Sequence, residues 1–265
     1  MLAAQIVGSG EPVVFLHAAV CDSRMWAAQL DGIGRHHRAI AYDRRGFGET
    51  RGEKEDFSAV ADLMAVIDAA ADGRPAILVG CSQGGKVALD AALRHPSRVR
   101  ALVLIAPSVT GAPDPVFPPQ IVALMAQQKQ AEQAHDLDRV NALKAHLWLD
   151  GPLQREGRVA GEARRLFLDM NGIALRSPPV GSNLDTAPNF DRLGEIGVPS
   201  LVVCGDFDFP HIQERCRHMA SVMPRASGRV LAGTAHLPSL EKPADVTQLV
   251  TAFIDHLSDG SVVSA

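Results

Sequence analysis

The segment Ala76–Leu89, AILVGCSQGGKVAL, decides the fold of this chain. It opens with a short apolar run that is typical of a buried strand. The run ends in the turn GCSQG, residues 80–84, and the residues after this turn have helical apolar spacing. A strand, a G-x-S-x-G turn and a helix form a nucleophile elbow, which holds the serine in a strained conformation at a helix N-terminus. The alternative is a Gly-rich turn without chemistry, but the flanking strand and helix favour a catalytic Ser82.

Strand-like and helix-like segments alternate on both sides of the elbow. Further strands are predicted by the apolar runs at 2–7, 13–17, 38–43, 99–105, 198–204 and 228–231. Ser23 is expected to be the N-cap of the helix after the second of these strands. Such alternation predicts an α/β fold with a mostly parallel, doubly wound sheet, because parallel strands need helical crossovers on both faces.

The alternation stops between residues 109 and 197. This segment opens with four closely spaced prolines, at positions 113, 115, 118 and 119, and continues as long helices rich in Gln, Ala and Leu. We expect it to form a helical cap inserted into an α/β core of residues 1–108 and 198–258. Residues 259–265 are expected to be a flexible tail.

Length and composition exclude several classes of protein. The 265 residues suffice for one large core with an insertion. The net charge of −4, without a basic run, argues against nucleic acid or an anionic membrane surface as a partner. No signal-peptide pattern and no apolar stretch of about 18 residues is present. The four cysteines lack metal-ligand spacing, which predicts buried free thiols in a reducing cytoplasm and no metal site.

A serine nucleophile needs a general base and an acid that orients it. In elbow folds these partners follow in the order Ser, acid, His. The last predicted strand runs into a loop that carries His236, and the strand before it runs into a loop with Asp206 and Asp208. Both loops emerge at the carboxyl ends of the strands, at the same sheet edge as Ser82. His17 and His211 are instead expected to be a structural histidine and a helix-start residue.

Together these motifs resemble the α/β-hydrolase family over nearly the full chain. Besides the elbow, the chain matches the Gly-x-x-Asp loop at 205–208, the His-Leu-Pro loop at 236–238 with Glu-Lys-Pro at 241–243, and the Asp-x-Arg-Gly-x-Gly loop at 43–48. The resemblance implies Asp208 as the acid of a Ser82–Asp208–His236 triad. Asp206 stays open as the rival, with a loop-bonding role as its alternative.

The resemblance also implies an oxyanion hole made of two backbone N–H groups. One belongs to Gln83, the residue after the nucleophile, and the other to the loop after His17. The family usually carries His-Gly in that loop, whereas this chain has His17-Ala18-Ala19, with Ala19 at the donor position. The chain departs from the family once more at its start, where another strand usually precedes Leu2. No cofactor and no metal is implied.

The implied chemistry is a two-step acyl transfer through Ser82. Size and cap position are similar to the enol-lactonase and small carboxylesterase branch, so a small ester or lactone is the expected substrate. Trp148 in the cap either lines the substrate pocket or packs in the core. Several cap arginines either bind a substrate carboxylate or form a solvated helix face, namely Arg139, Arg155, Arg158, Arg164, Arg165 and Arg176.

Other activities share these residues. Hydrolases of carbon–carbon bonds in ring-cleavage products, cofactor-free oxygenases and perhydrolases stay open, whereas haloalkane dehalogenases are disfavoured because they carry Asp at the nucleophile position. A small-molecule receptor on the same fold is the non-enzymatic alternative. We expect a cytoplasmic monomer or homodimer acting on a small molecule.

Overall fold

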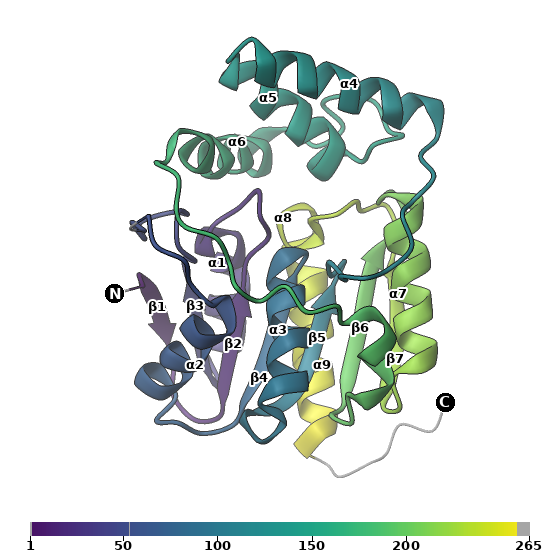
Figure 1. Cartoon of the computed structure of the whole chain (residues 1–265). Coiled ribbons are helices and arrows are strands. Elements are labelled where there is room, and N and C mark those ends of the chain that lie inside the picture. The colour runs from purple at the N-terminus through teal and green to yellow at the C-terminus, as the bar shows by residue number, and fades with distance from the viewer. Residues whose placement is uncertain (1, 53, 259–265) are drawn as a thin grey trace.

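The computed structural model describes residues 2–52 and 54–258, and a seven-stranded sheet forms its centre (Figure 1). The strand order is β1-β3-β2-β4-β5-β6-β7; β1 is antiparallel to β3 and the remaining pairs are parallel. The strands are β1 Ala4–Val7, β2 Pro12–Leu16, β3 Arg38–Tyr42, β4 Ala76–Cys81, β5 Val99–Ile105, β6 Ser200–Gly205 and β7 Ala226–Leu231. The predicted tail at 259–265 lies outside the described residues.

Helices cover both faces of this sheet. Alternate side chains of β2 enter different cores, because successive residues of a strand point to opposite faces. Val14 belongs to the core that also contains residues of α2, α3 and α7, and Phe15 belongs to the core with residues of α1 and α9. The helices are α1 Ala27–Ile33, α2 Ala59–Ala70, α3 Gln83–Arg94, α7 Pro210–Val222, α8 Pro238–Glu241 and α9 Pro243–Ser258. The predicted α/β fold with a mostly parallel, doubly wound sheet is therefore confirmed.

The predicted N-cap at Ser23 is wrong. Asp22 caps a 3-10 turn, Ser23–Trp26, with its carboxylate accepting the Arg24 N–H at 3.0 Å. The Ser23 N–H donates instead to the Asp43 carboxylate at 2.8 Å. The cap therefore lies one residue earlier than predicted, and the buried Asp43, directly after β3, binds the Ser23 amide.

Between β5 and β6 the chain forms α4 Pro119–Gln133, α5 Leu137–Lys144, a π-helical turn Ala145–Asp150 and α6 Gly161–Arg176. We call residues 119–176 the helical insert. In Figure 1 it lies across the upper end of the sheet, the end from which the chain runs into α8. After α6 the chain returns past α2 and α3 to a 3-10 turn, Phe190–Glu195.

The four cysteines are free and buried, as the sequence predicted. Among the described residues, no helix combines the length and apolar character that crossing a bilayer requires.

Candidate active site

Ser82 occupies the turn between β4 and α3 with φ 52° and ψ −116°, a conformation that residues with a Cβ rarely adopt. Its N–H donates to the Ile105 carbonyl at 3.0 Å, and its carbonyl accepts the Ser108 N–H at 2.9 Å. Gly84 lets α3 start directly against the end of β2, since a Cβ there would lie 2.2 Å from the Leu16 carbonyl oxygen. The turn therefore holds Ser82 at the N-terminus of α3, beside the loop that follows β2.

The loops after β6 and β7 bring an acid and a histidine together. His236 Nδ1 lies 2.8 Å from Asp208 Oδ2, and both side chains are buried. The other carboxylate oxygen of Asp208 accepts the Phe209 N–H at 2.7 Å. The two loops pack tightly at Gly205, where a Cβ would lie 2.1 Å from the Thr234 carbonyl oxygen. A glycine after β6 is thus needed for the contact between the loops that carry Asp208 and His236.

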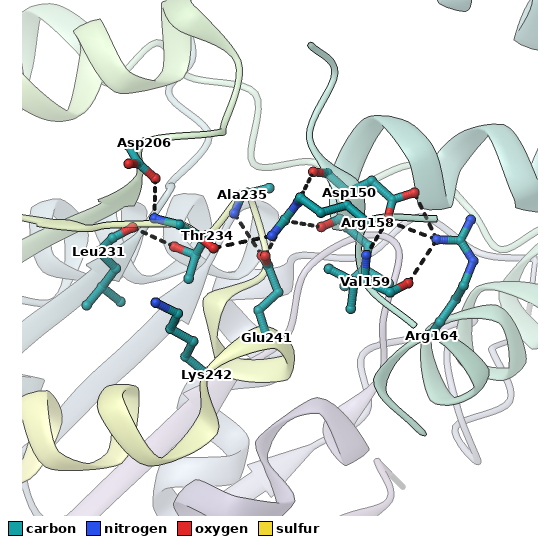
Figure 2. A network of polar contacts seen from close by, with 12 residues as sticks. Asp150, Arg158, Val159, Arg164, Asp206, Leu231, Thr234, Ala235, Glu241 and Lys242 are labelled. Atoms are coloured by element: carbon teal, nitrogen blue, oxygen red, sulfur yellow. Dashed lines mark hydrogen bonds and ion pairs between the residues drawn. The ribbon is translucent and has the colours of Figure 1, made fainter. Parts of the chain in front are cut away.

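Asp206, the rival acid, is directed elsewhere. It is exposed, and its Oδ1 accepts the Gly233 N–H at 2.6 Å. Figure 2 shows its carboxylate against the backbone of the loop after β7. The geometry therefore pairs His236 with Asp208 and gives Asp206 a loop-bonding contact.

The hydrogen bond to Asp208 assigns the tautomer of His236. An ionised carboxylate only accepts, so Nδ1 carries the proton and Nε2 keeps a lone pair. Nε2 is buried and has no hydrogen-bond partner among the described residues. The His236 carbonyl oxygen lies 3.7 Å from the Cys81 thiol, which donates to it. The His236 ring, with an Nε2 that no described residue binds, thus lies next to the elbow.

A cluster of aromatic rings extends from the His236 side chain. The Trp148 indole, in the π-helical turn of the helical insert, lies 4.6 Å from the His236 ring and 4.7 Å from the Phe209 ring, centroid to centroid. Phe117 and His211 extend the cluster. Burial, followed by the charge of Arg215, lowers the pKa of His211 to about 4. Trp148 also packs against both hydrophobic cores, so its two expected roles do not exclude each other.

The loop after β2 holds the second predicted oxyanion donor. His17 Nδ1 lies 2.8 Å from the Ala18 carbonyl oxygen, and His17 Nε2 accepts the Arg44 N–H at 3.0 Å. These contacts assign a neutral ring protonated at Nδ1. Burial, and next the Arg44 charge, hold the pKa of His17 well below its usual range. The fully buried His17 therefore has a structural place, as expected, with both ring nitrogens hydrogen-bonded.

His17 also orients the Ala19 amide. The described residues contain no cis peptide bond. In a trans peptide the carbonyl and the N–H lie in one plane and point in opposite directions, so the Ala19 N–H points away from the Ala18 carbonyl oxygen. Because the His17 ring binds that carbonyl, the Ala19 N–H points away from the ring. Ala19 is exposed and is not among the described residues with positive φ. Alanine in place of the usual glycine is therefore compatible with this loop.

Arg44 connects this loop to the elbow. Its guanidinium donates to Gln83 Oε1 at 2.7 Å and to the His17 carbonyl at 3.1 Å, and it stacks over the Phe47 ring at 4.8 Å. Burial is the main cause that lowers the pKa of Arg44, to about 10. The neighbouring Arg45 turns away and pairs with Asp62 on α2.

A second polar network reaches the His236 loop from the helical insert (Figure 2). Glu241 Oε1 accepts the Ala235 N–H at 2.8 Å, and its other oxygen pairs with Arg158. Arg158 also donates to the carbonyls of Gly233 at 3.2 Å and Leu149 at 3.0 Å. Burial raises the pKa of Glu241, and the hydrogen bond from Arg158 opposes that rise. The network therefore ties the helical insert to the residue before His236.

Asp150 closes this network inside the helical insert. Its fully buried carboxylate accepts the Gly157 N–H at 2.8 Å and the Val159 N–H at 2.9 Å, and it pairs with Arg164. Two other arginines from the predicted set form exposed ion pairs, Arg139 with Glu156 and Arg176 with Asp138. Within the described chain, no cluster of three or more His, Cys, Asp or Glu side chains could hold a metal ion.

The sequence analysis missed three residues that lie against the site: Arg44, Phe209 and Glu241. Arg44 occupies the variable position of the Asp-x-Arg-Gly-x-Gly loop, where the motif itself draws attention to Arg45. A second charged residue, after Asp43, at the end of the buried strand β3 was the available indication. Glu241 lay within a recognised motif, but spacing alone does not show that its carboxylate binds the Ala235 amide.

Comparisons with known proteins agree with this fold. A model of the alpha/beta hydrolase family matches residues 13–249. A pimeloyl-(acyl-carrier protein) methyl ester esterase from Yersinia enterocolitica is 27% identical over 253 residues, which cover 94% of this chain and 95% of the relative. A solved thermophilic esterase from Thermogutta terrifontis has a TM-score of 0.76 at 24% identity, covering 97% of this chain and 93% of the esterase. A solved N-acyl homoserine lactone degrading enzyme has a TM-score of 0.72 at 25% identity, and the match covers 95% of this chain and 96% of that enzyme.

The match spans the elbow, the helical insert that follows it in the chain, and the two loops that carry Asp208 and His236. Because the family model covers most of the chain and the sheet is mostly parallel with helices on both faces, the chain belongs to the alpha/beta hydrolase family.

Proposed function

We propose that this hydrolase cleaves a small carboxylic ester or lactone through an acyl-enzyme on Ser82. The observation that carries the proposal is the buried pair of His236 Nδ1 and Asp208 Oδ2, 2.8 Å apart, together with a His236 Nε2 that has no hydrogen-bond partner among the described residues. A neutral imidazole with a free Nε2 has the protonation state that accepts a proton from a serine hydroxyl.

In the first step the Ser82 hydroxyl oxygen attacks the substrate carbonyl carbon while its proton moves to His236 Nε2. Asp208 stabilises the resulting imidazolium through the bond to Nδ1. The N–H groups of Gln83 and Ala19 bind the oxygen that becomes negative; each such donor contributes about 3 kcal/mol to the transition state. The imidazolium then gives its proton to the leaving alkoxide, and the acyl group stays on Ser82.

In the second step water replaces the alcohol. His236 removes a proton from the water, the hydroxide attacks the acyl carbon, and the Ser82 oxygen leaves with the proton that His236 returns. The products are a carboxylic acid and free enzyme. For a lactone, acid and alcohol are parts of one molecule.

Relatives support the substrate class. The Yersinia relative is named a methyl ester esterase, and the lactone-degrading structure shares 25% of its residues with this chain. Trp148 packs on the His236 ring, and Phe209 and Phe117 continue this apolar surface away from it, which suits an uncharged ester group. We propose that these rings, and Trp148 first among them, contact the substrate.

The setting of the enzyme is a further part of the proposal. Residues 109–197 act as a cap over a core of 1–108 and 198–258, and the network from Arg158 to Glu241 supports this role. The four buried free thiols support a cytoplasmic location. A monomer or homodimer is expected, which light scattering after size-exclusion chromatography would measure.

The test uses a fluorophosphonate probe and a short-chain p-nitrophenyl ester on the wild type and on Ser82→Ala. The wild type should be labelled and should turn over, whereas Ser82→Ala should not be labelled and should lose kcat by at least on the order of 10⁴-fold. Asp208→Asn should lose a similar factor, since it upsets the His236 tautomer. Asp206→Asn is the matched control and should retain the wild-type rate. A panel of lactones then separates the two substrate classes.

A wild type that is neither labelled nor active would contradict the proposal and favour a receptor or an oxygenase on this fold. Labelling without turnover of esters or lactones would direct the search to carbon–carbon bond hydrolysis.

A further inference from the structure

Arg44 is a buried charge without an acid. Its side chain is 8% exposed, and no carboxylate lies within 4.0 Å of it among the described residues. The adjacent Asp43 is occupied by the N–H groups of Ser23 and Glu49, both at 2.8 Å. Arg44 Nε has no hydrogen-bond partner in the described structure. Burying an unpaired charge is costly, so a structural role alone is a poor explanation for this residue.

The contacts of Arg44 join the two residues that flank the predicted oxyanion hole. On one side the guanidinium binds the side chain of Gln83, and on the other it binds the carbonyl of His17 while its backbone N–H binds the His17 ring. That ring holds the Ala18 carbonyl and thereby directs the Ala19 N–H. Arg44 thus links the two residues that carry or direct the backbone donors, through its guanidinium and its own backbone N–H.

The charge of Arg44 also acts on the elbow. Burial, followed by the Asp208 carboxylate, raises the pKa of the Cys81 thiol, and Arg44 opposes that rise. A thiolate at the residue before Ser82 would therefore be favoured by Arg44. An oxyanion on the substrate carries the same sign of charge, and a low-dielectric site strengthens such an interaction.

We propose that Arg44 is a positioning residue of the oxyanion hole, which aligns the Ala19 and Gln83 amides and adds an uncompensated positive charge behind them. This inference rests on the proposed ester or lactone cleavage. It assigns to Arg44 a contribution to the transition state and none to substrate binding, because the guanidinium is covered by His17, Gln83 and Phe47.

Arg44→Met removes the charge and the guanidinium contacts to Gln83 and the His17 carbonyl, and it keeps the backbone N–H that binds the His17 ring. We expect kcat for a short-chain p-nitrophenyl ester to fall on the order of 10- to 100-fold, somewhat less than for loss of a direct donor, with KM nearly unchanged. Arg44→Lys keeps the charge and should recover a large part of the loss. Arg45→Met is the matched control, since its partner is Asp62 on α2 and its loss should leave kcat within about twofold.

A trifluoromethyl ketone gives a second readout. The Ser82 oxygen adds to its carbonyl, the proton moves to His236, and an anionic hemiketal occupies the oxyanion hole. Arg44→Met should weaken this inhibitor by the same factor as kcat, whereas the affinity for the matching methyl ketone should not change. A merely structural residue would instead lower thermal stability and shift both ketones equally. If Arg44→Met does not fold, Arg44→Gln replaces it as the neutral variant.

Two failures are distinguishable. A wild type without labelling or turnover overturns the proposed function and this inference with it. A wild type that turns over, with Arg44→Met or Arg44→Gln equal to it in kcat and in trifluoromethyl ketone affinity, overturns only the role of Arg44. Equal losses in Arg44→Lys and Arg44→Met would overturn the contribution of the charge.

Discussion

Two arginines lie next to the candidate active site, Arg44 buried and Arg158 half-buried, and they differ in whether a carboxylate pairs with them. Arg158 in the helical insert is 18% exposed and pairs with Glu241, itself 3% exposed. Arg44 is 8% exposed and binds a side-chain amide, a backbone carbonyl and an aromatic ring, and no carboxylate of the described residues pairs with it. Arg158 stacks on a ring as well, that of Phe207 at 5.1 Å. The acid is therefore the difference between them.

A paired arginine and an unpaired one are expected to have different effects, the first on stability and the second on the electrostatic field at the site. A guanidinium neutralised by a buried carboxylate joins two segments and leaves little net field, and removal of one partner exposes the cost of the other. A guanidinium without an acid keeps its full field and contributes little or negatively to stability. We therefore expect changes at Arg158 and Glu241 to act on stability, and changes at Arg44 to act on rate.

The largest expected effect is on the paired side. Glu241→Leu leaves Arg158 buried without an acid and leaves the Ala235 N–H without its acceptor. We expect the free energy of unfolding at pH 7.5 to fall by about 3 kcal/mol, at the low end for a broken buried pair because Arg158 keeps some contact with water. Urea denaturation measures it.

The double variant Arg158→Met with Glu241→Leu is the control for this prediction. Removing both charges should restore most of the lost stability, because replacement of a whole buried pair by apolar side chains is often neutral. If the double variant is as unstable as Glu241→Leu alone, the loss comes from the Ala235 amide and not from an uncompensated Arg158.

The next effect is a pH dependence from Glu241. Burial raises its pKa above the ordinary value of 4.5, so the folded protein binds this proton more tightly than the unfolded chain does. The stabilisation from this proton is fully present below about pH 4.5 and is lost as the pH rises through the folded-state pKa. Relative to Glu241→Gln, the wild type should lose up to about 1.4 kcal/mol per pH unit in that window.

Thermal or urea unfolding of the wild type and of Glu241→Gln from pH 4 to pH 8 measures the difference in their stability. A constant stability gap between wild type and Glu241→Gln across the range would show that Glu241 titrates at its ordinary value. The hydrogen bonds from Arg158 and Ala235 would then outweigh burial.

Much of the fold could be predicted because its determinants are local. The apolar run of β4, the glycines of the elbow and the return of short apolar runs at β6 and β7 each specify an element without knowledge of distant residues. The Ser23 cap was wrong by one residue, because Asp22 and Ser23 are adjacent and both are favoured N-cap residues. The fold places the Ser23 N–H on Asp43, twenty positions away, and leaves the cap to Asp22, which no local pattern could decide.

The same limit applies to the site. Ser82, Asp208 and His236 lie in short motifs, so their positions could be predicted and the structure places Asp208 and His236 in contact. Arg44 and Glu241 act through contacts that only the folded chain creates, to Gln83 and to Ala235. In the sequence the motif points to Arg45 and leaves Arg44 as its variable neighbour, whereas in the fold Arg44 contacts Gln83 and Arg45 binds Asp62.

The smallest expected effect is the most informative for the comparison. Arg44→Met should not lower the free energy of unfolding by more than about 1 kcal/mol, since the hydrogen bonds lost are offset by relief of an unpaired buried charge. Urea denaturation of Arg44→Met beside Glu241→Leu would measure both arginine sites on one scale. A stable Arg44→Met with a reduced kcat would show that the fold carries this charge at no benefit to itself. A loss as large as that of Glu241→Leu would mean that Arg44, like Arg158, holds segments together, and the absence of an acid beside it would then need another explanation than catalysis.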